Sequence, residues 1–160
     1  MACVEHPVGC KDYKDISTWA LETSSGVITN EIETAHPGRR NAFRHFIWRA
    51  EMEVEMGSEV SEYFADAHEA WNSIAETTDH LADLANNETA IGIAHEVMAH
   101  LPPKTIGTDL RVDTIPAMLR RTESAQQVVA LAKAQIEADD YMTTYDFPSS
   151  LNRPDLARIP

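Results

Sequence analysis

Apolar residues recur at helical spacing through most of this 160-residue chain, and this pattern restricts the fold that the chain can adopt. The clearest example lies between residues 58 and 76, where Val60, Phe64, Ala67, Trp71 and Ile74 share one face of a helix. No segment alternates between apolar and polar residues in the way that a half-buried strand would. The sequence therefore predicts an all-α fold.

Glycine and proline residues divide the chain into about five or six expected helices. The first should begin near Asp15, weaken around the SSG at 24–26, and be followed by a break at the HPG of 36–38. Further helices are expected at about 41–56, 58–76 and 80–101, with one or two more over 114–142. We predict a single compact multi-helix domain over 1–160, in which 1–14 and 143–160 are loose or extended. The C-terminal tail contains Pro148, Pro154 and Pro160.

Charge is distributed unevenly along the chain, whose formal net charge is −13. Residues 50–103 contain twelve acidic residues and no Lys or Arg, whereas Arg39, Arg40, Arg44 and Arg49 precede them within eleven residues. This asymmetry is typical either of a solvated face or of a site that binds a cation beside an anionic group. It disfavours broad nucleic-acid binding, which requires a basic surface.

The two cysteines lie close together in the sequence, at Cys3 and Cys10. Pro7 and Gly9 could turn the chain between them, so a small disulfide loop is one interpretation. The two cysteines flank His6 and could also suggest a metal site, but a structural zinc site normally needs four ligands. We favour the simpler interpretation of two ordinary thiols near a loose terminus.

Three of the expected helices carry rows of polar side chains on faces that should be buried. Residues at i, i+3, i+4 and i+7 share a face, because a helix turns by about 100° per residue. The rows are Asn41, His45 and Trp48 or Arg49; Glu62, Asp66 and Glu69; and His80, Asp83 and Asn87. His68 lies roughly opposite Asp66, so both can face one site only if their helix ends or distorts.

If the three rows converge, they would place imidazole, carboxylate and amide groups in one cleft. Such a set can bind a divalent metal, which offsets the burial of carboxylates and activates a bound water. The predicted catalytic residues are His45, Asp66, His68, Glu69 and Asp83, of which His45, Asp66, Glu69 and Asp83 would be the metal ligands. Arg44, Arg49, Asn41 and Asn87 would bind or orient the substrate. The alternative is a buried hydrogen-bond network in which His45 bonds to Asp83 or Asp66.

The stretch from Gly38 to Gly92 resembles an uncharacterised bacterial domain family with the blocks DAFRHxxW, DAHE and NN. The matching residues are Ala42, Phe43, Arg44, His45 and Trp48; Asp66, Ala67, His68 and Glu69; and Asp83, Asn86, Asn87 and Gly92. Asn41 stands where the family pattern has Asp, which argues against a role that requires a carboxylate there. Members of that kind often look like C-terminal parts of secreted polymorphic toxins or effectors. The resemblance implies a polar site made by these blocks and leaves its reaction open.

We therefore expect a metal-assisted hydrolase-like domain acting on an anionic phosphoester or cell-envelope substrate. The resemblance adds the setting of a bacterial toxin or effector, with an inhibitor or immunity protein as a partner. The alternative is a non-catalytic acidic helical module that binds a basic partner protein. We expect a soluble protein, either in the bacterial cytoplasm or exported without a cleaved signal peptide, because no apolar run approaches the ~18 residues of a membrane span.

Overall fold

The computed structural model of the protein describes residues 7–72, 78–101 and 114–143, and these ranges are helical apart from short connections. The helices are α2 (Pro7–Val27), α3 (Asn30–Ala35), α4 (Arg39–Met56), α5 (Ser58–Asn72), α6 (Thr78–His100) and α7 (Thr114–Glu137). The all-α prediction is confirmed. Within the described ranges, no helix has the length and apolar character needed to cross a membrane.

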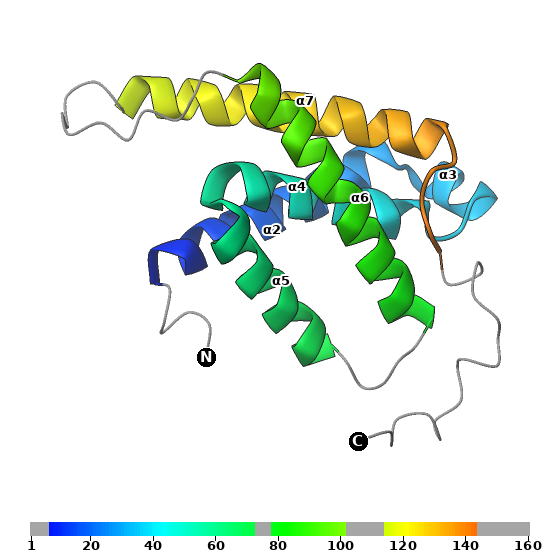
Figure 1. Ribbon diagram of the computed structural model, residues 1–160. Helices are drawn as coiled ribbons and strands as arrows, with labels where there is room; N and C mark the ends of the chain where they lie inside the picture. Colours follow the sequence, from blue (N-terminus) through cyan, green and yellow to red (C-terminus); the bar gives the residue numbers. More distant parts are fainter. Residues whose placement is uncertain (1–6, 73–77, 102–113, 144–160) are drawn as a thin grey trace.

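The central element of the fold is α4, which contacts α2, α5, α6 and α7. Figure 1 shows α7 lying across the top of the other helices, with α5 and α6 descending in front of α4. Twelve of the eighteen residues of α4 are buried, including Phe43, Phe46 and Ile47. A helix that is covered on most of its circumference does not show a single apolar stripe. This position explains why polar residues occur among apolar ones throughout 41–54.

The first helix begins earlier than predicted, at Pro7 rather than near Asp15, so the expectation of a loose segment is wrong for residues 7–14. Proline fits the first turn of a helix, because the N–H that it lacks would have no partner within the helix. Gly9 allows close approach to α5, since a Cβ at this position would lie 3.0 Å from a ring carbon of Phe64. Cys10 is disulfide-bonded, so the interpretation as two ordinary thiols is also wrong. The other cysteine of the chain lies outside the described residues.

A buried polar cluster fixes the turn between α4 and α5. Gly57 ends α4 with φ of 79°, a positive value that glycine adopts without steric strain. The carboxylate of Glu53 accepts hydrogen bonds from the hydroxyls of Ser58 and Ser61 and from Arg49 Nη1, the last at 2.9 Å. These bonds tie the last turn of α4 to the first turn of α5.

The segment that follows α7, residues 138–143, returns to α4 and α6; we call it the C-terminal segment. The carboxamide of Asn86 on α6 bonds both backbone groups of Met142, with Nδ2 donating to O and Oδ1 accepting from N, each at 2.9 Å. Arg39 on α4 donates from Nε to the hydroxyl of Tyr141 at 2.9 Å. These contacts hold the C-terminal segment against the start of α4 and the first half of α6. The tail beyond residue 143 lies outside the described residues.

Candidate functional site

A pocket of about 340 Å³ lies where α2, α4 and α5 meet. Its described lining residues are Tyr13, Ser17, Ala20 and Leu21 from α2, Arg44, His45 and Trp48 from α4, and His68 from α5. They supply one guanidinium, two imidazoles and a phenol, and none of them carries a carboxylate. The chain as a whole has a net charge of −13, but this lining has no negative side chain and one positive one, so it suits an anionic group.

Tyr13 forms the wall of the pocket on the α2 side and contacts aromatic rings of two other helices. Its ring stacks on Phe64 with centroids 5.0 Å apart and meets Trp48 edge-on at 6.2 Å. Its hydroxyl lies 3.2 Å from Nδ1 of His68. Burial raises the pKa of the Tyr13 phenol, against a smaller lowering by Ser17. The hydroxyl is therefore protonated at neutral pH and can donate to the imidazole of His68.

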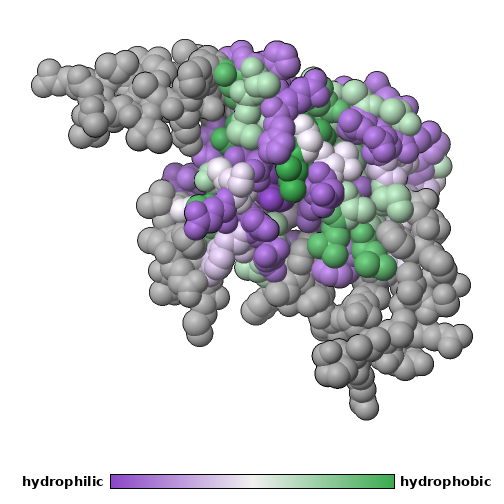
Figure 2. Space-filling model, viewed as in Figure 1, coloured by the Kyte–Doolittle hydropathy of each residue, from purple (hydrophilic) through white to green (hydrophobic). Residues whose placement is uncertain are grey.

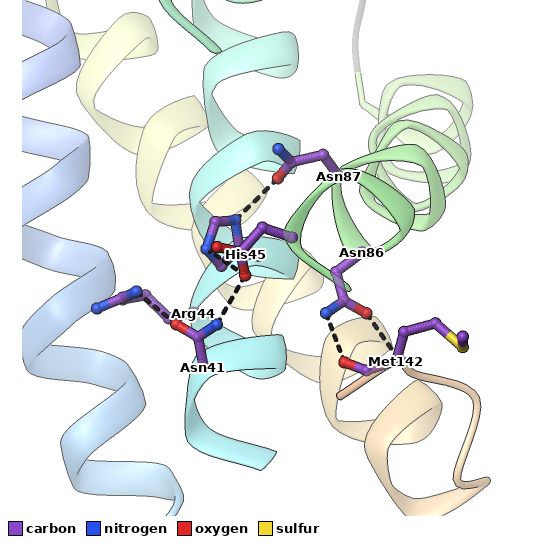
Figure 3. Close-up of polar contacts among 7 residues, drawn as sticks. Asn41, Arg44, His45, Asn86, Asn87 and Met142 are labelled. Atoms are coloured by element: carbon purple, nitrogen blue, oxygen red, sulfur yellow. Dashed lines mark hydrogen bonds and ion pairs between the residues drawn. The ribbon is translucent and has the colours of Figure 1, made fainter. Parts of the chain in front are cut away.

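A chain of hydrogen bonds joins Arg44 on the pocket side of α4 to α6. The guanidinium of Arg44 donates through Nη2 to Oδ1 of Asn41, whose Nδ2 donates to Oδ1 of Asp83 at 2.7 Å. The same carboxylate oxygen lies 3.0 Å from Nε2 of His45. On the other side of the ring, Nδ1 of His45 lies 3.0 Å from Oδ1 of Asn87. Figure 3 shows this polar network between α4 and α6, with Arg44 extending away from it toward the blue helix on its other side.

Both ring nitrogens of His45 are thus engaged by groups of the protein. The residue is 2% exposed, and each nitrogen faces an oxygen. His45 is therefore placed to hold α4 and α6 in register beside the pocket, whereas His68 is the imidazole that faces the pocket from α5.

The two consecutive asparagines of α6 have different partners. Asn87 points to His45, whereas Asn86 points to the backbone of Met142 in the C-terminal segment (Figure 3). Neighbouring positions on a helix are separated by about 100°, so one helix can present the two amides to different elements. The NN block therefore serves both the site and the attachment of the C-terminal segment.

The structure brings together six residues that the sequence analysis proposed for the site, and it places others elsewhere. The network contains Asn41, Arg44, His45, Asp83 and Asn87, and His68 lines the pocket beside it. Asp66 was predicted as a catalytic residue and metal ligand, but it is exposed on α5 and does not line the pocket that His68 lines. Arg49 is buried in its ion pair with Glu53 instead of lining the pocket. The side chain of Glu69 lies outside those that the structure describes.

The four predicted metal ligands are brought together only in part. His45 and Asp83 are in contact, and Asp66 is not part of their network. Among the described residues, no group of three or more His, Cys, Asp or Glu side chains is arranged to hold a metal ion. Metal binding therefore stays a prediction that a measurement has to test.

Sequence reasoning missed the contribution of α2 to the pocket. Tyr13, Ser17 and Leu21 follow one another at i, i+4 and i+8, so they share a helical face. Ser17 accepts a hydrogen bond from Nε1 of Trp48 at 3.1 Å, which joins this face to α4. The spacing could have revealed these residues, but the assignment of 1–14 to a loose terminus removed Tyr13 from the helix.

Fold and site together define a small all-α domain with a polar pocket at the junction of three helices. A family model described as "Domain of unknown function (DUF6973)" matches residues 1–114, and the chain belongs to this family. The match confirms that the chain carries a domain of unknown function, and it does not bear on the sequence blocks or on the toxin setting. No curated protein and no solved structure matches the chain. The matched range ends at the first residue of α7, so the C-terminal segment lies beyond it.

Proposed function

We propose that the pocket binds a phosphoester or similar anionic group and that the domain hydrolyses it. The observation that carries this proposal is the lining, which combines one guanidinium, two imidazoles and a phenol with no carboxylate among its described residues. Arg44 would bind the anion, since its planar guanidinium can bond two oxygens of a phosphate at once. No carboxylate in the described part of the chain forms an ion pair with Arg44, so its charge is available to a ligand.

His68 is the candidate general acid and base. In hydrolysis of a phosphoester, the oxygen of water bonds to phosphorus as the bond to the leaving oxygen breaks. The imidazole would remove a proton from the water or give one to the leaving oxygen. Tyr13 supports this role, because its hydroxyl lies 3.2 Å from Nδ1 and fixes the orientation of the ring. The apolar and aromatic neighbours Leu21 and Trp48 would contact the rest of the substrate.

A divalent metal is a separate part of the hydrolase proposal. His45 and Asp83 would be two of its ligands, since they already share one network. Elemental analysis of protein purified without chelator tests this part directly. Near-stoichiometric metal that is lost in both His45→Ala and Asp83→Ala, with the variants folded, would support it. Unchanged metal content in the two variants would refute the assignment of the ligands.

The hydrolase proposal is tested by a substrate screen over phospholipids, nucleotides and peptidoglycan fragments, with and without added divalent metal. Arg44→Gln and His68→Asn should each lower turnover, the second by about 10²–10⁴-fold if His68 acts as general acid or base. Lys133→Gln and His95→Asn are matched controls, because each changes the same kind of group at an exposed position outside the lining. Turnover that is the same in all four variants would refute the site.

The second candidate function, binding of a basic partner, is favoured by one feature of α5. Glu59, Glu62 and Asp66 are all exposed and share a helical face. The acidic half as a whole is less uniform than its sequence suggested, because Glu51 and Glu53 are buried. Figure 2 likewise shows hydrophobic patches among the hydrophilic residues of the face that it draws. Partner binding through the exposed face of α5 should weaken steeply as salt rises, whereas turnover in the pocket, where the charges are partly buried, should change less.

A further inference from the structure

Asn41 joins the cation of the pocket to the carboxylate behind it. Its Oδ1 accepts from Nη2 of Arg44, and its Nδ2 donates to Oδ1 of Asp83 at 2.7 Å. One carboxamide therefore bonds a positive group on one side and a negative group on the other. It can do so because an amide is both an acceptor and a donor.

A carboxylate of the same shape at this position would have the opposite electrostatic effect. It would pair with Arg44 and cancel the charge that faces the pocket. It would also bring two negative oxygens within hydrogen-bond distance of each other, because the nitrogen that donates to Asp83 would become an oxygen. The neutral amide keeps the geometry of both bonds and avoids both consequences.

We propose that Asn41 is a positioning residue that makes the pocket selective for anions. It orients the guanidinium of Arg44 through a neutral group, so the positive charge is held in place without being neutralised. This inference rests on the proposed function, because it assumes that the pocket takes an anionic ligand. It narrows the ligand to one that carries a full negative charge, such as a phosphate ester, since a neutral ligand would gain little from an unpaired guanidinium.

Titration with inorganic phosphate tests the inference, with the NMR signal of the indole N–H of Trp48 as the probe because this ring lines the pocket. Asn41→Asp should weaken binding by at least about tenfold, since the new carboxylate lies near the bound anion in a partly buried site. Asn41→Ala removes the same two hydrogen bonds without adding charge and should weaken binding only by about two- to threefold, through lost orientation. Equal weakening in the two variants would show a merely structural role and overturn the inference.

Two further variants separate the inference from the proposed function and from loss of folding. Arg44→Gln should abolish phosphate binding; if it binds like the parent, or if the parent does not bind phosphate, the anion site itself is refuted. The double variant Asn41→Asp with Asp83→Asn exchanges the amide and the carboxylate, which keeps one of each between the helices; circular dichroism and thermal unfolding check that it is folded. It should still bind phosphate at least about tenfold more weakly than Asp83→Asn alone. Equal affinity in these two folded variants would overturn the role of Asn41.

Discussion

The ion pair between Arg49 and Glu53 yields a stability prediction whose size can be worked out from its burial. Arg49 is 5% exposed and Glu53 is 2% exposed, and Nη1 of Arg49 lies 2.9 Å from Oε2 of Glu53. Glu53→Gln keeps the shape of the side chain but leaves the guanidinium buried without its counter-charge. Removing one partner of a buried pair in this way destabilises a protein by about 3–5 kcal/mol. We expect the lower end, about 3 kcal/mol, because the carboxamide oxygen can still accept one of the serine hydroxyls.

Thermal and denaturant unfolding would measure the effect of Glu53→Gln. For a chain of this size, about 3 kcal/mol corresponds to a fall in Tm of roughly 6–12 °C. Glu59→Gln is the matched control, since Glu59 is exposed on α5, and its Tm should change by less than about 2 °C. Adding Arg49→Met to Glu53→Gln removes the stranded charge and should recover about 1–3 kcal/mol of the loss.

The loss of stability in Glu53→Gln should depend on pH, because the carboxylate of Glu53 titrates in the parent. Burial alone would raise the pKa of Glu53, but hydrogen bonds from Ser58 and Ser61 and the charge of Arg49 outweigh it, so the pKa is lowered in the folded protein. A lowered pKa contributes stability above the ordinary value of 4.5, and this contribution is lost as pH falls through the folded-state value. The gap in unfolding free energy between parent and Glu53→Gln should therefore be constant from about pH 6 to 8 and shrink below about pH 4.5. A gap under about 1 kcal/mol at pH 7, or one that widens in acid, would refute this reasoning.

Four further perturbations test the attachment of the C-terminal segment, two glycines and the disulfide. Asn86→Ala removes both bonds to the backbone of Met142 and should lower the free energy of unfolding by about 2–3 kcal/mol. Hydrogen exchange at the amide of residue 142 should become faster. Unchanged exchange would show that Asn86 does not hold the C-terminal segment in place. Gly38→Ala should lower the free energy of unfolding by about 1–3 kcal/mol, because φ is 91° at this position and the new Cβ would lie 3.0 Å from Thr143. Gly92→Ala should raise the free energy of unfolding by about 0.5–1 kcal/mol, because the new Cβ has open space and alanine favours the helix. Denaturant unfolding measures both. Reduction of the disulfide at Cys10 should lower stability by about 2–4 kcal/mol, and an unchanged Tm in reductant would show that it contributes nothing.

Local signals in the sequence were sufficient for most of the helix boundaries. Gly57 separates α4 from α5, and the end of α6 at His100 falls just before the prolines at 102 and 103. These signals act within one or two turns of the chain, through the φ values that glycine allows and the N–H that proline lacks. The start of α2 was missed because tertiary contacts at Gly9 and a disulfide at Cys10 stabilise a segment whose composition resembles a loose terminus.

The site could be predicted only as far as helical faces allow. Spacing placed Asn41 and His45 on one face of α4, and Asp83 and Asn87 on one face of α6, and these four residues are joined in the structure. Which oxygen meets which nitrogen depends on how the two helices cross, and no local signal specifies that crossing. Arg49 shows the same limit. Its spacing allows it to share a helical face with His45, but its hydrogen bonds to Glu53 and Ser61 direct its side chain toward the turn between α4 and α5.

The two asparagines of α6 connect the C-terminal segment to the site through one short stretch of helix. Asn86 is 1% exposed, and its carboxamide is satisfied by the backbone of Met142, which lies beyond the range matched by the family model. Without the C-terminal segment, this amide would lose both bonds together with the residues that bind it, and α6 would shift locally as water replaces them. The next residue, Asn87, holds His45, so any such movement of α6 changes the network that ends at Arg44. A chain cut after residue 137 should therefore lose phosphate binding at the pocket as well as stability, even though every described lining residue is retained.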